Sequence, residues 1–245
     1  MAQAITERVT VAIATSLVAS LLSRRSAHLE ILGVSTGLVW LTLDGQALTI
    51  QSVPTNSKLA LPTSIFLQSG TPMTPEITLR AGRLSLDDIP LQITRWWNPP
   101  RSQVVVWNGG YGAVPDIDTL MGWGSGLTPE GDDLIAGWLV MARSIGHPGF
   151  EATRAKVLSA SARSTTSFSA ALLGCAAEGY GVSPLIDYVT SQLEDPKHSS
   201  DQRARLAQVG HTSGSALAYG VDLALGFADP QFNFTDTSSQ ERAIA

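Results

Sequence analysis

The strongest constraint on the fold is a change in sequence texture near residue 110. Before this point, short runs of β-branched and bulky apolar residues alternate with Gly, Pro and Asp, which is typical of short strands joined by turns. After residue 120, longer stretches rich in Ala, Leu and Ser favour helices. The sequence therefore predicts an α+β fold, in which an N-terminal helix and a small antiparallel β sheet or barrel precede a C-terminal helical bundle.

The same change predicts how the chain is divided. We expect an N-terminal, mostly β domain over residues 1–110 and a helical domain over residues 111–228 that carries the glycine-rich loops. Residues 229–245 contain few apolar anchors and are expected to form a flexible tail.

The first helix is predicted over residues 9–22, where apolar residues recur four positions apart. This spacing places them on one stripe of a buried amphipathic helix. A signal peptide is the alternative, because a run of small and apolar residues follows a single arginine. Thr and Ser interrupt the run, and no small-residue cleavage site precedes the next pair of arginines, so the sequence favours the helix.

The remaining elements follow from local patterns. Strands are predicted at 33–43, 46–53, 59–67, 77–86, 91–97 and 103–107. Asp44-Gly45 predicts a tight hairpin turn between the first two strands, since both residues tolerate a positive φ. Helices are predicted at 128–145, 150–162, 166–178, 183–194, 200–209 and 213–227. Small residues recur in these helices, so we expect the helices to pack closely.

Composition excludes several classes of protein. The 16 basic and 21 acidic residues give a net charge of −5, so a nucleic-acid partner is not expected. No run reaches the roughly 20 apolar residues that span a bilayer, so no membrane partner is expected. One cysteine, Cys175, allows neither an internal disulfide nor a Cys-rich zinc site, and its apolar helical surroundings indicate packing. The four histidines share no close spacing, so no metal site is assigned. The single cysteine is compatible with a reducing compartment, and a cytoplasmic location is expected.

The most informative segment is the glycine-rich stretch at 122–134, Gly-Trp-Gly-Ser-Gly-Leu-Thr-Pro-Glu-Gly-Asp-Asp-Leu. Thr128 can cap a helix that begins with Pro129, where the missing N–H costs nothing. The preceding glycines free the backbone to approach a ligand closely. The amides of the loop and of the first helical turn can then bind an anion, although an ordinary helix start is the alternative.

Two adjacent acids favour a ligand site. Consecutive helical residues diverge by about 100°, so at most one of the Asp132 and Asp133 carboxylates can point the same way as the loop amides. The other must face a neighbouring helix or a partner group. Such a pair indicates a general base, a metal ligand or a substrate clamp, and this leaves a Mg²⁺ cofactor open.

A second loop, at 209–217, also precedes an apolar helix. Thr212 or Ser213 can cap this helix, so hydroxyls and amides again collect at a helix start. His211 lies among these groups and titrates near neutrality, so it can pass a proton. The alternative is a packed histidine with a satisfied hydrogen bond.

A third cluster of hydroxyls lies at 163–169. Thr165 or Thr166 would cap the following helix, and Ser169 lies three or four residues on, on the same face. Arg163 could supply a positive charge for a carboxylate or a phosphate. A simple cap with a polar turn is the alternative interpretation.

These segments together resemble the oxamate carbamoyltransferase subunit family, the AllH-like proteins. The resemblance is carried by Gly-Ser-Gly-Leu-Thr-Pro-Glu-Gly-Asp-Asp-Leu at 124–134 and Gly-His-Thr-Ser-Gly at 210–214, with similar stretches at 163–169 and at Trp97-Asn98-Pro99. It implies a subunit that works with two larger partners in late allantoin and purine-nitrogen catabolism. The implied complex interconverts oxalurate plus phosphate with oxamate plus carbamoyl phosphate.

One departure from the family pattern bears on activity. The family often carries an acid after Gly-His-Thr-Ser-Gly-x, whereas this chain has Ala216 there. If that acid is catalytic or binds a metal, this chain has lost it. A variant reaction, or a role without catalysis, then becomes a stronger alternative.

The sequence predicts an enzyme or enzyme subunit that acts on a small anionic carbamoyl or carboxylate substrate, of the carbamoyl-transfer type. The alternatives are a non-catalytic partner subunit or small-molecule binder, and a biosynthetic tailoring enzyme on the same scaffold. Larger partner subunits or a homo-oligomer are expected, and no nucleotide-cofactor motif is found. Catalysis is assigned to Asp132, Asp133 and His211, and substrate binding to Gly124, Ser125, Gly126, Thr128, Arg163, Thr165, Thr166, Ser169, Thr212, Ser213 and Gly214.

Overall fold

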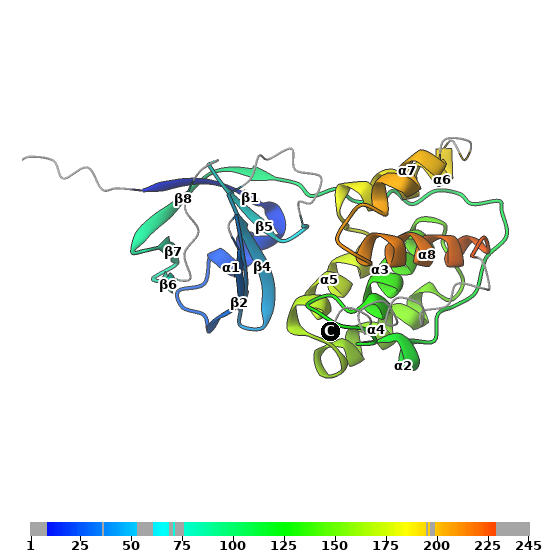
Figure 1. The fold of residues 1–245 in the computed structure, drawn as a ribbon, viewed down its shortest axis with the longest axis horizontal. Helices are drawn as coiled ribbons and strands as arrows, with labels where there is room; N and C mark the ends of the chain where they lie inside the picture. Colours follow the sequence, from blue (N-terminus) through cyan, green and yellow to red (C-terminus); the bar gives the residue numbers. More distant parts are fainter. Residues whose placement is uncertain are drawn as a thin grey trace, which may run out of the picture.

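The computed structural model describes residues 9–35, 37–52, 61–68, 71, 76–194, 196 and 199–228. A strand-rich N-terminal part is followed by a helical C-terminal part, and the two lie side by side (Figure 1). The strands form one sheet with the order β2-β3-β4-β5-β1-β8-β7-β6. The predicted α+β class is therefore confirmed.

The sheet is mixed rather than purely antiparallel. Its strands are β1 (Thr10–Thr15), β2 (Leu29–Ser35), β3 (Leu38–Leu43), β4 (Gln46–Gln51), β5 (Ser64–Leu67), β6 (Ile77–Arg80), β7 (Arg83–Leu86) and β8 (Ile89–Trp97). The β1–β8 and β4–β5 pairs are parallel, and the other pairs are antiparallel. The prediction of an antiparallel sheet is wrong at those two pairs, because each joins strands that are far apart in the sequence or linked by a long connection.

The predicted helix over residues 9–22 is wrong for its first half. Residues Thr10–Thr15 form β1, and only a 3₁₀ turn, η1 (Ser16–Val18), and the short α1 (Ala19–Leu22) are helical. Ala12 and Ala14 are almost fully buried, while Val11 is exposed and Ile13, which lies between the two alanines, is only partly buried. This period of two is that of a strand, and pairing with β5 and β8 on both sides outweighs the helix-like spacing.

Two of the predicted strands each contain a turn, and a third predicted strand does not form. Residues 77–86 make the hairpin β6–β7, in which Ala81 and Gly82 have φ values of 51° and 77°. Residues 33–43 divide between β2 and β3. Residues 103–107 form an extended segment without a strand partner, and Val106 is 90% exposed. This apolar run was predicted to be buried, but the described strands all pair elsewhere.

The Asp44-Gly45 turn is confirmed. Leu43 pairs with Gln46 across it, and the two turn residues have φ values of 49° and 76°. Positive φ at both central positions suits the right-handed twist of the strands. Residues 36, 53 and 59–60, which belong to three predicted strands, and the tail 229–245 lie outside the described residues.

The six predicted helices form close to their predicted bounds. The helices of this part are α2 (Ile117–Leu120), α3 (Glu130–Ser144), α4 (Phe150–Ser164), α5 (Ser167–Ala177), α6 (Ser183–Glu194), α7 (Ser199–Leu206) and α8 (Ser213–Leu225). Within the described part, no helix is long and apolar enough to cross a membrane.

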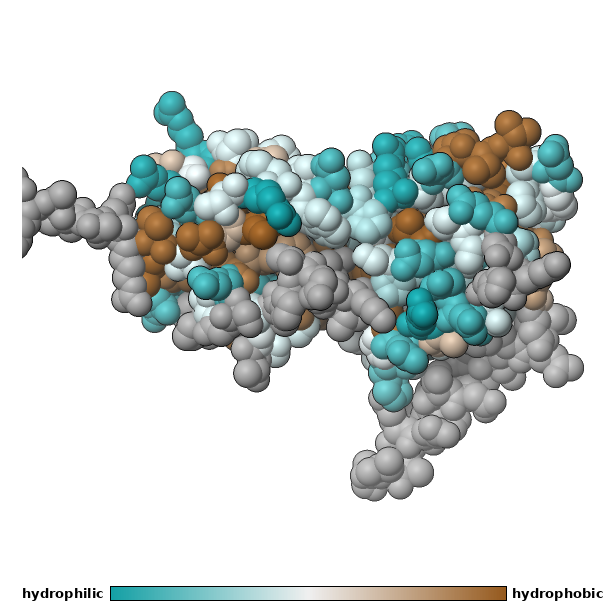
Figure 2. Space-filling view, turned by 90° about the horizontal axis from the view of Figure 1, so that it is seen from above, coloured by the Kyte–Doolittle hydropathy of each residue, from teal (hydrophilic) through white to brown (hydrophobic). Residues whose placement is uncertain are grey.

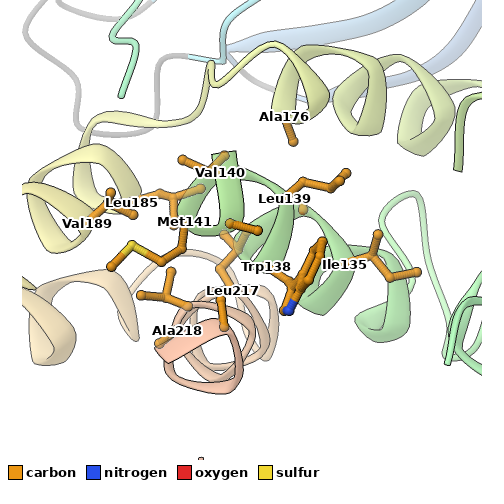
Figure 3. Packing of buried hydrophobic residues seen from close by; sticks show 14 of the residues in the cluster. Ile135, Trp138, Leu139, Val140, Met141, Ala176, Leu185, Val189, Leu217 and Ala218 are labelled. Atoms are coloured by element: carbon orange, nitrogen blue, oxygen red, sulfur yellow. The ribbon is translucent and has the colours of Figure 1, made fainter. Parts of the chain in front are cut away.

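Helix α3 is the centre of the helical part, and almost all of its residues are buried. Trp138, Leu139 and Met141 project from it into a core that α5, α6 and α8 complete (Figure 3). Glycines let α3 and α8 touch. A Cβ on Gly137 would lie 2.0 Å from the Leu217 carbonyl oxygen. The prediction of closely packed helices is therefore confirmed at this pair.

The sheet has its own apolar core and also meets the helices. Its buried side chains include Leu41, Leu48 and Ile65, and apolar residues are also exposed on the face of the sheet part shown in Figure 2. Helix α5 packs against β3 and β4, so one helix joins the two parts of the molecule. This junction is where the candidate site lies.

Candidate functional site

A cavity of about 550 Å³ lies between the sheet and the helices. Its walls come from strands β3 and β4 and from the two glycine-rich loops together with α3, α5, α6 and α8. The lining residues are Ser35, Gly37, Leu38, Trp40, Gln51, Leu61, Pro62, Leu127, Thr128, Asp133, Ala136, Phe168, Leu172, Ala176, Tyr180, Gly181, Val182, Leu185, Val209, Gly210, Ser213 and Leu217. Most of them are apolar.

The polar end of the cavity is built by both glycine-rich loops. Thr128 and Ser213 hold their hydroxyl oxygens 3.3 Å apart, although 85 residues separate them in the sequence. Asp133 lies beside them and is only 7% exposed. Its Oδ2 atom is buried and has no hydrogen-bond partner. A buried carboxylate oxygen without a partner is costly unless a ligand or a proton satisfies it.

Burial raises the pKa of the Asp133 carboxyl group from its usual value near 3.8 to about 7. The charges of Asp132 and Glu130 raise the pKa further, while hydrogen bonds from Ser213 and Thr128 lower it. The loss of hydration outweighs these bonds. Near neutral pH, Asp133 therefore populates both its protonated and its ionised forms, which suits a group that exchanges a proton with a substrate.

The orientation of Asp133 follows from the way α3 begins. The Pro129 carbonyl oxygen accepts hydrogen bonds from the amides of Asp132 and Asp133, at 3.0 and 3.1 Å. Pro129 occupies the cap position, and its helix begins at Glu130, one residue later than predicted. Thr128 was predicted to be the cap, but no side chain caps this helix. Its hydroxyl contacts Ser213 instead.

Asp132 points away from the cavity and is fully used inside the protein. Its Oδ1 accepts a hydrogen bond from the Gly122 amide at 2.8 Å, and its Oδ2 accepts bonds from the hydroxyls of Thr165 and of Ser169, the latter at 2.7 Å. The side chain is 1% exposed. The predicted divergence of the two carboxylates is confirmed, and Asp132 fixes the first glycine-rich loop to the start of α5.

The hydroxyl cluster at 163–169 contributes to the same attachment. Thr166 caps α5 by accepting a bond from the Ser169 amide at 3.0 Å, and its hydroxyl donates to the Leu127 carbonyl at 2.6 Å. Arg163 is exposed on α4. Of the predicted binding residues Arg163, Thr165, Thr166 and Ser169, none lines the cavity. Thr165, Thr166 and Ser169 instead hold the loop in place.

The first loop has the backbone conformation that its glycines allow. Gly122, Gly124 and Gly126 have φ values of 75°, 110° and 86°. A Cβ on Gly122 would also lie 2.2 Å from the Ser164 carbonyl oxygen. Residues 124–126 are exposed and do not line the cavity, whereas residues 127 and 128 do.

The second loop also lines the cavity with only some of its residues. Gly210 and Ser213 line the cavity, but His211 is exposed and Thr212 is not part of the walls. Thr212 holds the cap position of α8, as predicted, but its side chain makes no capping hydrogen bond. Gly214 is buried, where a Cβ would lie 1.9 Å from the Leu206 carbonyl oxygen. The structure therefore brings Asp133, Thr128 and Ser213 together and leaves His211 outside.

Sequence reasoning missed the sheet side of the cavity. Leu38 and Trp40 line it, while Val39 and Leu41, at the alternate positions of the same strand, are fully buried in the sheet core. A strand that is apolar on both faces is covered on both faces. This signal was present in residues 38–43, but the sequence does not show what covers the second face.

The charge of the cavity differs from the prediction of an anion site. Among the described residues that line it, Asp133 is the one side chain that changes its charge near neutral pH, and none is Lys, Arg or His.

Elsewhere in the described part, Asp222 is held by Tyr188 and by Arg203, whose Nε lies 3.0 Å from its Oδ2. The described residues contain no cluster of three His, Cys, Asp or Glu side chains that could hold a metal ion.

Comparison with known families supports the resemblance seen in the sequence. Residues 120–225 match the model of a family described as oxamate carbamoyltransferase subunit AllH. The match spans α3 to α8 and includes both glycine-rich loops. No solved structure matches the chain. The family resemblance is thus confirmed for the helical part, which supplies the polar end of the cavity.

Proposed function

We propose that this chain is a subunit of a carbamoyl-transfer enzyme. The support for this is that residues 120–225 match the model of the oxamate carbamoyltransferase subunit AllH family. In this proposal, the polar end of the cavity holds the carbamoyl or carboxamide group of the substrate. The observation that carries the proposal is that Asp133 lines a ligand-sized cavity while its buried Oδ2 atom has no hydrogen-bond partner. An amide N–H supplies the donor that this oxygen lacks.

Carbamoyl transfer to an amide nitrogen also needs a base. The nitrogen forms a bond to the carbamoyl carbon, the leaving group departs with its electron pair, and the nitrogen loses a proton. Asp133, with a pKa of about 7, can take this proton in its ionised form. The hydroxyls of Thr128 and Ser213 lie beside its carboxyl group and favour its ionised form.

Partner subunits form part of the proposal. An anionic substrate group such as a phosphate or carboxylate favours a cationic contact, and the described walls contain none. We assign this contact to a partner subunit that covers the open side of the cavity. His211, Arg163 and the loop residues 124–126 are exposed and lie outside the walls, so a partner subunit can reach them.

The test compares the chain alone with the chain together with the proteins that copurify with it from its own cells. Carbamoyl transfer from carbamoyl phosphate to oxamate is followed as phosphate release. We expect Asp133→Asn to reduce this rate by roughly 10²-fold or more. Asp118→Asn, at an exposed position, is the matched control and should retain full activity. Full activity of a folded Asp133→Asn variant would overturn the proposal.

A non-catalytic binding subunit is the second candidate, and the apolar walls of the cavity favour it. In that case the chain binds a ligand but no assembly that contains it depends on Asp133 for turnover. Saturable binding to the wild-type chain, combined with equal rates for complexes that contain wild-type and Asp133→Asn chains, would support this second candidate.

A further inference from the structure

The cavity is larger and more apolar than oxamate or carbamoyl phosphate requires. Its volume of about 550 Å³ lies within the range of roughly 300–1,000 Å³ typical of sites for drug-sized ligands. The polar groups gather at one end, around Asp133, Thr128 and Ser213. The other walls are dominated by carbon atoms. A small polar anion would leave most of this apolar surface uncovered.

The apolar walls face one another across the junction of sheet and helices. Leu38 and Trp40 line the cavity from β3, and Phe168 and Leu172 line it from α5. Trp40, Leu38 and Leu172 are only partly buried by the protein itself. Partly buried apolar side chains at a cavity gain about 25 cal/mol for each Å² of apolar surface that a ligand covers.

The polar end also selects against an anion. Asp133 carries negative charge in part of the population near neutral pH, and Asp132 and Glu130 lie close enough to raise its pKa. A ligand carboxylate placed against Asp133 would meet charge of the same sign. An uncharged head group that donates N–H bonds satisfies the Oδ2 atom without this repulsion.

We propose that the substrate of this chain is amphipathic, with a carbamoyl or carboxamide head group at Asp133 and an apolar body against Trp40, Leu38, Phe168 and Leu172. The identity of the head group rests on the proposed function. The apolar body rests on the volume and the walls of the cavity alone. The cavity of this chain therefore favours alkyl or aryl amides and carbamates over oxamate.

The experiment is a calorimetric titration of the full chain with unbranched alkyl carbamates, from methyl to hexyl, and with oxamate. We expect the affinity to rise with chain length, by up to about fourfold for each methylene group buried. Binding should show a negative heat-capacity change, which marks the burial of apolar surface. Equal affinity across the series, or oxamate binding more tightly than hexyl carbamate, would overturn the proposal.

Two variants separate the head group from the body. Leu172→Trp fills the apolar end and should abolish the dependence on chain length. Its matched control, Leu158→Trp, lies at a position that is 42% exposed on α4 and should bind like the wild type. A Leu172→Trp variant that keeps the full dependence would contradict the assigned position of the apolar body.

Asp133→Asn tests the head group in the same assay. It should weaken every member of the series by a similar factor and leave the dependence on chain length unchanged. If the affinity depends on the length of the alkyl group but Asp133→Asn has no effect on the binding of any member, the apolar site stands and the proposed carbamoyl function fails. If oxamate binds with a dependence on Asp133 while the alkyl series shows no trend, the proposed function stands and the amphipathic substrate is excluded.

Discussion

Asp132 and Asp133 are consecutive residues in the first turn of α3, yet their carboxyl groups have opposite surroundings. Asp132 accepts bonds from Gly122, Thr165 and Ser169, whereas Asp133 keeps one buried oxygen without a partner at the cavity. The roughly 100° between adjacent helical positions produces this separation. One acid therefore holds the loop, and the other lines the cavity, where we propose that it acts on a ligand.

The unusual pKa of Asp133 predicts a pH-dependent stability. Because its pKa of about 7 in the folded chain lies above 3.8, the folded state binds the proton more tightly than the unfolded state. The resulting stability is fully present below about pH 4 and is lost as the pH rises to about 7, up to about 4 kcal/mol in total. Asp133→Asn should remove this contribution and be more stable than the wild type at pH 8.

The measurement is the free energy of unfolding in urea at several pH values, for the wild type and Asp133→Asn together. The difference between the two chains isolates this group from other residues that titrate. A difference that stays constant between pH 4 and pH 8 would contradict the raised pKa. If Asp133→Asn is more stable than the wild type at pH 8 but does not bind the ligand, Asp133 is a residue kept for function at a cost in stability.

The hydroxyls around Asp133 should tune this pH dependence. Hydrogen bonds from Ser213 and Thr128 lower the pKa of Asp133. Ser213→Ala removes one of them, so the pH range over which stability is lost should move upward. Ser215→Ala, two residues along α8 and outside the cavity walls, is the control. A downward shift for Ser213→Ala would be inconsistent with a bond that stabilises the ionised carboxylate.

Asp132 should matter for stability rather than for ligand contact. Asp132→Asn replaces a carboxylate that accepts bonds from three groups by an amide with one acceptor oxygen. We expect a loss of about 1–3 kcal/mol in the free energy of unfolding, because buried donors lose charge-assisted bonds. Asp118→Asn, which removes an exposed ion pair with Lys156, should cost at most about 1 kcal/mol. Equal effects of the two substitutions would argue against the structural role of Asp132.

Local sequence patterns predicted the helical part well and the sheet part less well. Helices such as α6 form over the predicted residues, because caps and apolar spacing act within a few turns. Residues 9–22 have the same spacing, but β1 lies between β5 and β8, and this pairing decides its conformation. Residues 103–107 show the converse, since an apolar run forms no strand without a neighbour to pair with.

The candidate site was predictable at its polar end only. The glycine-rich loops and the divergence of Asp132 and Asp133 follow from spacing along one chain segment. The contact between Thr128 and Ser213 depends on how α3 packs against α8. The placement of Leu38 and Trp40 depends on how the sheet meets α5. These tertiary relationships exclude His211 from the cavity and make the cavity largely apolar.

The single cysteine offers a test of the α5 region. Burial raises the pKa of the Cys175 thiol to about 12, so almost no thiolate is present at neutral pH. We expect slow alkylation by iodoacetamide in the folded chain and rapid alkylation after unfolding in urea. Rapid alkylation of the native chain at pH 7.5 would contradict the raised pKa of this partly buried thiol.

The contact between α3 and α8 should depend on the absence of a side chain at Gly137. A Cβ there would lie 2.0 Å from the Leu217 carbonyl oxygen, so Gly137→Ala must push two central helices apart. We expect a loss of about 1–3 kcal/mol in the free energy of unfolding.

Gly174→Ala is the matched control, because Gly174 lies within α5 with no atom within 4 Å of the added Cβ. That substitution should stabilise the chain by about 0.4–1 kcal/mol through the better helix propensity of Ala and the reduced entropy of the unfolded state. Since Leu217 and Ser213 lie on the same helix at the cavity, Gly137→Ala should also weaken carbamate binding, whereas Gly174→Ala should not. If both substitutions had the same sign of effect on stability, the close contact of α3 with α8 would be refuted.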